Sequence, residues 1–270
     1  MNHLENSNFS QFKGLIFDID GTLTHDGKAI AGAIDVIKQL REQEFQLRFV
    51  TNTTGRSPHQ LATQLSRLGF CVIAEEIQTS VTACKHYLST EMKGKSGYLA
   101  IPDVTKPMLT GIEHNEINPD FVVIGDLENG FDYKLLNKLF NFIHNGARLI
   151  AFHRNPFYFR EGKTWLDSGA FTRVFEGITN QAAIITGKPS SALFNSAVSS
   201  MGLMPEQVLV VGDDVSSDIQ GANNSGLHSI LVGTGKFKPE HLTGDFPKAN
   251  TIIDSLTELT NLLSNIKAGK

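Results

Sequence analysis

Short, continuous apolar runs alternate along the chain with longer segments of helical periodicity. The runs begin at Gly14 (GLIF), Leu47 (LRFV), Cys71 (CVI), Tyr98 (YLAI), Phe121 (FVVI), Arg148 (RLIAF), Ala182 (AAII), Val208 (VLVV) and Ser229 (SILV). Because these runs are continuous rather than alternating, they predict strands covered on both faces, as in a parallel sheet. Between them, apolar residues recur at helical spacing, as in residues 30–40 and 193–201. The pattern predicts an α/β fold with a doubly wound, mostly parallel, Rossmann-like sheet.

Three of the predicted strands end in polar residues. GLIFDIDGT ends in Asp18 and Asp20, LRFVTNTT in Thr51 and Asn52, and VLVVGDD in Asp213 and Asp214. In open α/β sheets, ligands gather at the carboxyl ends of the strands. If the three strands are neighbours, carboxylates, a hydroxyl and an amide converge on one crevice.

A long stretch, about residues 78–186, separates the second of these strands from the third and has strand and helix signals of its own. A segment of that length is too long for a loop, so it predicts a domain inserted into the first one. We therefore expect a core made of residues 1–78 and 186–270 and an inserted α/β domain at residues 79–185.

Composition and charge bear on the partners. The chain has 24 Lys and Arg against 28 Asp and Glu, a net charge of −4, which favours no nucleic-acid or anionic-membrane partner. No apolar run approaches the roughly 18 residues of a membrane span, and the start MNHLENSNFS lacks the apolar stretch of a secretory signal. The two cysteines, Cys71 and Cys84, match neither a disulfide framework nor a zinc pattern. We expect a cytoplasmic protein with no nucleic-acid or membrane partner.

The first acidic pair has the spacing of a reactive site. Asp18 and Asp20 are two residues apart, so their side chains leave extended backbone on the same side. Two carboxylates this close repel each other and need a metal ion or a proton. Gly21 lets backbone N–H groups turn toward an anion, and an aspartate beside a bound phosphate can attack phosphorus, while a second carboxylate handles the protons. The alternative for DIDG alone is a capping aspartate and a turn aspartate.

An anionic nucleophile that attacks a phosphoryl group needs positive charge nearby. Mg²⁺ suits this role because it takes one or two protein carboxylates together with a phosphate oxygen. Asp18 and Asp213 can be those carboxylates, and Asp214 and Asp218 would lie nearby to complete or orient the coordination. Alternatively, the acids after VLVVG cap a helix and favour its dipole, which is compatible with metal binding.

Other polar residues can contact a substrate. Thr51 and Asn52 offer a hydroxyl and an amide to a phosphoryl group, and Lys188 in TGKPSS can neutralise both the nucleophile and the phosphate. In the inserted domain, Asp126 and His153 end strand-like runs and can reach a leaving group. The alternative for His153 is a histidine whose hydrogen bonds are satisfied at a strand end.

Taken together, the motifs resemble the haloacid dehalogenase superfamily of phosphotransferases. They are DIDGT at residues 18–22, the run that ends in Thr51, Lys188, and GDD with Asp218, in the family's order. The large insertion and VTNTTGRS are similar to the C2-capped, NagD-like branch (subfamily IIA). Within it, TNTTGRS, FVVIGDLENGFDY, LIAFHRNPFYF and LDSGAF resemble the group around phospholysine phosphohistidine inorganic pyrophosphate phosphatase and its haloacid dehalogenase-like relatives.

The resemblance implies a Mg²⁺-dependent phosphatase that hydrolyses a small phosphorylated metabolite through an aspartyl phosphate. It makes Asp18 the nucleophile and Asp20 the general acid and base, with the Asp20 backbone carbonyl and Asp213 as further metal ligands. The phosphate-binding residues would be Gly21, Thr51, Asn52 and Lys188. The inserted domain would be a C2-type cap that excludes water and selects the substrate, and a homodimer formed through the cap is the expected assembly.

Other functions share an acidic site of this kind. A phospho-accepting signalling module also uses an acidic pair, a threonine and a lysine, but it is shorter and has no inserted domain. A phosphotransferase or phosphomutase would move the phosphoryl group instead of releasing it. A binding protein that has lost catalysis is disfavoured because Asp18, Asp20, Lys188 and Asp213 are all present.

Overall fold

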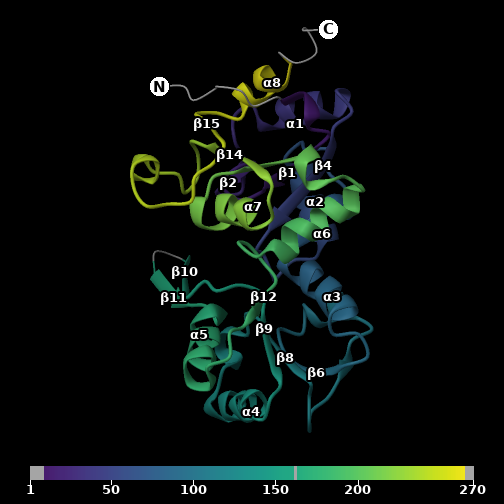
Figure 1. The fold of residues 1–270 in the computed structure, drawn as a ribbon, viewed down its shortest axis with the longest axis vertical. Coiled ribbons are helices and arrows are strands. Elements are labelled where there is room, and N and C mark those ends of the chain that lie inside the picture. Colours follow the sequence, from purple (N-terminus) through teal and green to yellow (C-terminus); the bar gives the residue numbers. More distant parts are fainter. Residues whose placement is uncertain (1–8, 161–162, 265–270) are drawn as a thin grey trace. The chain divides into compact units, whose positions relative to one another are not determined.

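The computed structural model describes residues 9–160 and 163–264, and the chain divides into two compact units (Figure 1). The first unit comprises Met1–Thr51, Pro58–Gln78 and Lys188–Lys270, and the second comprises Asn52–Ser57 and Thr79–Gly187. The chain therefore passes from one unit to the other after Thr51, Ser57, Gln78 and Gly187.

A six-stranded sheet with the order β15-β14-β13-β1-β4-β5 forms the centre of the first unit. Its strands are β1 (Gly14–Asp18), β4 (Gln46–Thr51), β5 (Ile77–Thr79), β13 (Val208–Gly212), β14 (His228–Val232) and β15 (Thr251–Ile253). β1 lies between β13 and β4 and is parallel to both, with Phe17 opposite Val211 and Asp18 opposite Val50. The three strands that end in the predicted polar site are thus neighbours.

Helices cover both faces of this sheet. They are α1 (Ala33–Glu42), α2 (Pro58–Arg67), α6 (Ser191–Met201), α7 (Gln220–Asn224) and α8 (Thr257–Ser264). Leu15 and Phe17 belong to the apolar cluster that includes α1, α2 and α8. Ile16 points to the opposite face, where its neighbour Arg48 donates a 2.7 Å hydrogen bond to Ser200 of α6. The first unit is therefore doubly wound.

The second unit contains a parallel five-stranded sheet with the order β12-β9-β8-β6-β7. Its strands are β6 (Ser96–Ala100), β7 (Glu113–His114), β8 (Phe121–Ile124), β9 (Arg148–Ala151) and β12 (Ile184–Ile185). Phe121 and Val123 pack with α3 (Ser80–Thr90), whereas Val122 and Ile124 pack with α4 (Tyr133–His144) and α5 (Ser168–Thr179). Burial on both faces explains why FVVI is apolar throughout.

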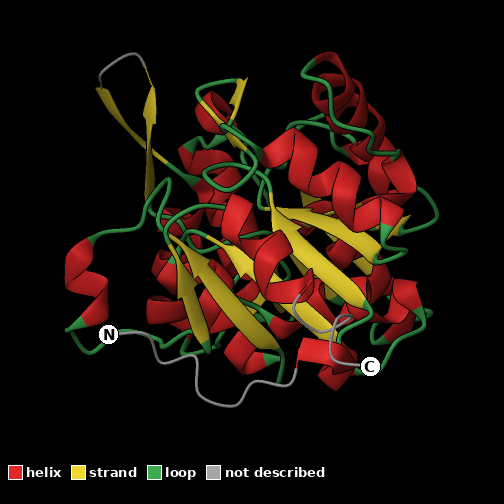
Figure 2. Cartoon of the chain, turned by 90° about the horizontal axis from the view of Figure 1, so that it is seen from above, coloured by secondary structure: helices red, strands yellow, loops and turns green. Residues whose placement is uncertain are grey.

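The predicted α/β, doubly wound and mostly parallel fold is confirmed, and one predicted strand is wrong. Residues 71–73 form no strand, and they lack the predicted burial on both faces, since Cys71 and Ile73 are exposed and only Val72 is buried; β5 begins later, at Ile77. The prediction also missed two antiparallel pairs, β2 (Thr24–His25) with β3 (Lys28–Ala29), and β10 (Phe157–Arg160) with β11 (Lys163–Leu166). Figure 2 shows β10 and β11 as the strand pair that flanks a grey segment.

Within the described ranges, 9–160 and 163–264, no helix is long and apolar enough to cross a membrane. Both cysteines are free thiols, Cys71 exposed and Cys84 buried. Burial raises the pKa of the Cys84 thiol to about 12, so this group stays protonated at neutral pH.

Candidate active site

A buried lysine joins two carboxylates at the carboxyl end of β1. Lys188 Nζ donates to Oδ1 of Asp18 and, over 2.7 Å, to Oδ1 of Asp218. None of the three side chains is more than 6% exposed. Two carboxylates buried this closely would repel each other strongly, and the ammonium group between them offsets that repulsion.

Burial shifts the pKa values of the three residues in this ion-paired group. It raises the pKa of Asp18 to about 7 and that of Asp218 to about 6, although Lys188 acts in the opposite direction. Burial also disfavours the charge on Lys188, but the two carboxylates outweigh it and hold the pKa of the lysine above its ordinary value. Asp18 is therefore poised between its two forms, and a cation beside it would favour the ionised one.

Three carboxylates gather here in the manner of a metal site. Asp18, Asp213 and Asp218 each present one oxygen, and these oxygens all lie within 4.8 Å of one another. Among the side chains that the structure describes, Asp18 Oδ2 is one of the few buried polar atoms without a hydrogen-bond partner. A buried carboxylate oxygen of this kind needs a ligand, and a hard divalent cation such as Mg²⁺ is a suitable one.

Two neighbouring loops fix the orientation of Asp213. Its Oδ1 accepts a 3.0 Å hydrogen bond from the Thr22 hydroxyl, and its Oδ2 accepts a 2.7 Å hydrogen bond from the backbone N–H of Lys236. Burial and the charge of Asp218 raise the pKa of Asp213, and these hydrogen bonds act against that rise. Neither donor was predicted from the sequence. Lys236 follows β14 in the segment GTGK, and this glycine-containing strand end was the available signal.

Asp214 is directed to other partners. Its carboxylate accepts a 2.9 Å hydrogen bond from the backbone N–H of Ser216 and pairs with Lys236 Nζ at 2.8 Å. It caps the π-helical turn Val215–Ile219, as the alternative interpretation of this motif held. Burial disfavours its ionisation, but Lys236 holds the pKa of Asp214 well below the usual range. The carboxylate group around Asp18 does not include it.

Asp20 and Gly21 lie in the turn that follows β1. Asp20 is exposed, in contrast to the buried Asp18, and its Oδ1 accepts a 3.4 Å hydrogen bond from the Thr24 hydroxyl. The backbone N–H of Gly21 donates to the carbonyl oxygen of Thr24 at 2.7 Å. The turn itself therefore uses the amide that was predicted to bind phosphate.

The chain also passes close to Asp213 at Gly21. Its φ is +106°, and a Cβ built there would lie 2.4–2.6 Å from the carboxylate atoms of Asp213. We expect Gly21→Ala to displace that carboxylate and to weaken Mg²⁺ binding at least about tenfold, as when the groups that orient a metal ligand are lost. Isothermal titration calorimetry measures the affinity.

Gly27 is the matched control, because it has φ +73° and a Cβ added to it would meet no atom within 4 Å. Gly27→Ala therefore tests backbone strain alone, which costs about 1–2 kcal/mol in urea unfolding. It should leave Mg²⁺ affinity unchanged. Equal affinities of the two variants would contradict the role assigned to Gly21.

The two polar residues predicted at the end of the run LRFV belong to different units. Thr51 ends β4 beside the end of β1 and is 3% exposed. Asn52 belongs to the second unit, where the Ser80 hydroxyl donates to its carbonyl oxygen at 3.4 Å. A Cβ on Gly187 would lie 2.5 Å from Asn52 Oδ1, so this glycine permits a close approach of the two segments.

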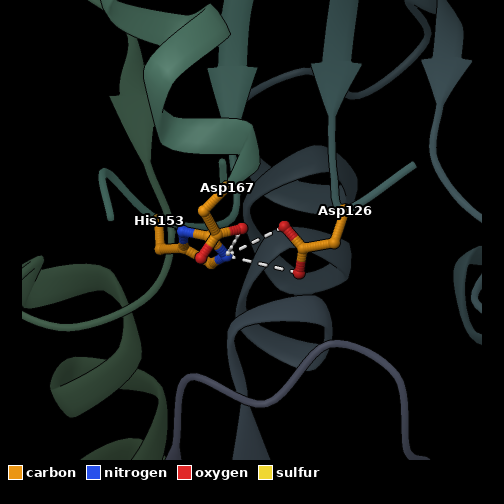
Figure 3. A group of neighbouring side chains, drawn as sticks. All are labelled: Asp126, His153 and Asp167. Atoms are coloured by element: carbon orange, nitrogen blue, oxygen red, sulfur yellow. Dashed lines mark hydrogen bonds and ion pairs between the residues drawn. The ribbon is translucent and has the colours of Figure 1, made fainter. Parts of the chain in front are cut away.

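Asp126 and His153 lie together in the second unit (Figure 3). They follow the neighbouring strands β8 and β9. His153 Nε2 lies 3.0 Å from Asp126 Oδ1 and 3.8 Å from Oδ1 of Asp167, the residue that caps α5. The alternative interpretation of His153 as a histidine with satisfied hydrogen bonds agrees with these contacts. Contact of either residue with a substrate stays a prediction.

Comparison with known proteins matches two segments of the chain to models of haloacid dehalogenase-like hydrolases. The model for haloacid dehalogenase-like hydrolases matches residues 15–112, and a second HAD-hydrolase-like model matches residues 185–259. Haloacid dehalogenase-like hydrolase domain-containing protein 2 of Rattus norvegicus is 37% identical over 226 residues, which cover 84% of this chain and 86% of the relative. Human phospholysine phosphohistidine inorganic pyrophosphate phosphatase is 31% identical over 257 residues, with 93% and 94% covered.

The fold is also similar to solved structures of known proteins. NagD from E. coli K-12 matches with a TM-score of 0.83 and 28% identity, over 92% of this chain and 98% of that chain. A glycerol phosphate phosphatase from Mycobacterium tuberculosis, solved in complex with magnesium, matches with a TM-score of 0.81 and 26% identity, over 96% of this chain and 79% of that chain. The match to NagD agrees with the resemblance of the sequence motifs to the NagD-like branch.

Proposed function

The chain belongs to the haloacid dehalogenase-like hydrolases, and on that basis we propose that it is a Mg²⁺-dependent phosphatase of small phosphorylated metabolites. The observation that carries the proposal is the buried carboxylate group at the end of β1 with Lys188. When ionised, the three carboxylates and the one ammonium group together have a formal charge of −2, which a divalent cation balances. Relatives named as phosphatases, and one solved with magnesium, support the proposal.

The proposed reaction proceeds through Asp18. A carboxylate oxygen of Asp18 forms a bond to phosphorus while the bond from phosphorus to the leaving oxygen breaks. Asp20, on the exposed turn, donates a proton to that oxygen and later removes one from the water that hydrolyses the aspartyl phosphate. Lys188 stabilises the negative charge that develops on the transferring group. Asp18, Asp213 and the Asp20 carbonyl would hold Mg²⁺, which favours the ionised form of Asp18 and neutralises the phosphate.

The remaining predicted residues have supporting roles in this proposal. Thr51 and Asn52 bind the phosphoryl group, and Asp218 holds Lys188 in place through its 2.7 Å hydrogen bond. The second unit is the proposed cap, with Asp126 and His153 in the part that selects the substrate. A homodimer remains a prediction.

Metal removal is the direct test. We expect the full chain to release inorganic phosphate from p-nitrophenyl phosphate with Mg²⁺, to lose at least about 100-fold of that rate in EDTA, and to regain it when Mg²⁺ is restored. Asp213→Asn should need about tenfold more Mg²⁺ for half-maximal activity, because it removes a charged metal ligand. Asp214→Asn is the matched control: its carboxylate is bound by Ser216 and Lys236, so the Mg²⁺ requirement should not change.

The other outcomes separate the alternatives. Phosphate release that ignores chelation would remove the metal from the proposal. A stable phospho-protein without turnover would indicate a phospho-accepting module, and transfer to an added alcohol without phosphate release would indicate a phosphotransferase. With activity established, a panel of phosphorylated metabolites assayed for phosphate release identifies the substrate class.

A further inference from the structure

We propose that Asp126 is a positioning residue that fixes the loop after β4 and thereby orients Asn52, one of the proposed phosphate-binding residues. The inference rests on the proposed function, because it concerns where Asn52 is held within the second unit. Its basis is a single carboxylate that binds side chains from three other segments of the second unit, one of which is that loop.

Asp126 accepts hydrogen bonds on both of its oxygens. The Thr54 hydroxyl donates to Oδ2, and the Ser168 hydroxyl donates to Oδ1 over 2.5 Å. His153 Nε2 lies 3.0 Å from Oδ1 and 3.3 Å from Oδ2. Three donors on one carboxylate fix its orientation and favour its ionised form.

Thr54 lies in the loop after β4 and links this loop to the Asp126 carboxylate. Its hydroxyl donates to Asp126, and its backbone carbonyl accepts a 3.2 Å hydrogen bond from the Thr105 hydroxyl. Thr54 is 6% exposed and Thr105 is fully buried, so water competes little for either contact. Thr54 is two residues from Asn52, a length of chain that spans at most about 7 Å. An anchor at Thr54 therefore limits where Asn52 can lie within the second unit.

The rest of the cluster holds Asp126 in turn. Burial opposes ionisation of Asp126, but His153, Ser168 and Thr54 hold its pKa well below the usual range. Burial also opposes the charge on His153, yet Asp126, with a smaller effect from Asp167, raises the pKa of the imidazole. Asp167 caps α5 by accepting a 2.8 Å hydrogen bond from the backbone N–H of Ser168, so the start of that helix is tied to the same cluster.

The group of Asp126, His153 and Asp167 also has the composition of a metal site. The ring of His153 favours a hydrogen-bonded cluster instead. The backbone N–H of Asn155 points to Nδ1 at 3.3 Å, so a neutral ring carries its hydrogen on Nε2, and a charged ring carries one there in any case. In either form a proton, and not a lone pair, faces Asp126.

Thr54→Val tests the proposal, because it removes the hydroxyl and keeps the shape. We expect the backbone amides of residues 52–57 to exchange hydrogen about tenfold faster. KM for p-nitrophenyl phosphate should rise about tenfold, with a much smaller change in kcat. A factor of about ten is what the loss of one charge-assisted hydrogen bond produces. Inhibition by inorganic phosphate should weaken by a similar factor. Thr54→Ser should restore all three measurements.

Two further variants show whether the effect passes through Asp126. Asp126→Asn should reproduce the faster exchange, and in combination with Thr54→Val it should add less than about threefold, because both changes break the same contact. Thr179→Val is the control, since it removes a hydroxyl from the second unit that donates to Phe175 and not to this cluster. That variant should leave exchange at residues 52–57 and KM unchanged.

The results separate this proposal from the proposed function. Wild-type exchange and wild-type KM in Thr54→Val, or fully additive effects with Asp126→Asn, would overturn the positioning role. If the wild-type chain releases no phosphate, the proposed function fails, while hydrogen exchange still tests whether Asp126 holds the loop.

Discussion

Asp18→Asn will stop phosphate release and leave the fold intact. Asparagine has nearly the same shape but is a poor nucleophile, so we expect the rate to fall by roughly 10⁴-fold or more, as when other enzymes lose their nucleophile. The fold should tolerate the change because the site already disfavours charge: burial raises the pKa of Asp18 to about 7. Lys188 also keeps its second partner, Asp218. Phosphate release at saturating Mg²⁺ and urea unfolding measure the two effects.

Asp20→Asn provides the comparison for this variant. It keeps the nucleophile and removes the proton donor, so esters with poor leaving groups should slow much more than p-nitrophenyl phosphate, whose phenol leaves readily. Rapid acid quenching should trap labelled phospho-protein in Asp20→Asn and none in Asp18→Asn. Undiminished turnover by the Asp18 variant would exclude covalent catalysis through this residue.

Lys188→Met should be costly for both stability and turnover. It leaves Asp18 and Asp218 buried without their counter-charge, and breaking a buried ion pair in this way costs about 3–5 kcal/mol. Because the ammonium group is also proposed to stabilise the transferring phosphoryl group, turnover should fall by about 10²–10³-fold. Urea unfolding in the absence of added metal measures the first effect, and phosphate release at saturating Mg²⁺ measures the second.

A second substitution separates the two consequences. Combining Lys188→Met with Asp218→Asn removes one of the two uncompensated carboxylates, so part of the lost stability should return while activity stays low. A Lys188→Met protein as stable as the wild type would show that the lysine does not hold the carboxylates together.

The sequence predicted those parts of the site that follow from strand order. A continuous apolar run identifies a strand buried on both faces, and parallel neighbours bring their carboxyl ends together, so Asp18, Thr51 and Asp213 could be placed at one edge of the sheet. The short run CVI failed this rule, because it is flanked by a turn and buries only Val72.

Contacts made by loops could not be predicted in this way. The Thr22 hydroxyl and the backbone N–H of Lys236 reach Asp213 from turns, and no periodicity fixes the direction of a donor group in a turn. Asp214 is the same type of residue as Asp213 and follows the same strand, yet its carboxylate binds Ser216 and Lys236 instead. The hydrogen bond from Thr54 to Asp126 joins residues 72 apart in sequence, and neither position has a pattern that points to the other.

The division of the second unit into two segments of chain affects how it can be exchanged between relatives. An experimenter who builds a chimera by replacing only Thr79–Gly187 with the insert of a relative would move Asp126 and leave Thr54 behind. The foreign insert would then lack the partner with which its own residue at the position of Asp126 forms this hydrogen bond. Transplanting Asn52–Ser57 along with it keeps donor and acceptor from the same parent, so the transferable module is two separate pieces of chain rather than one.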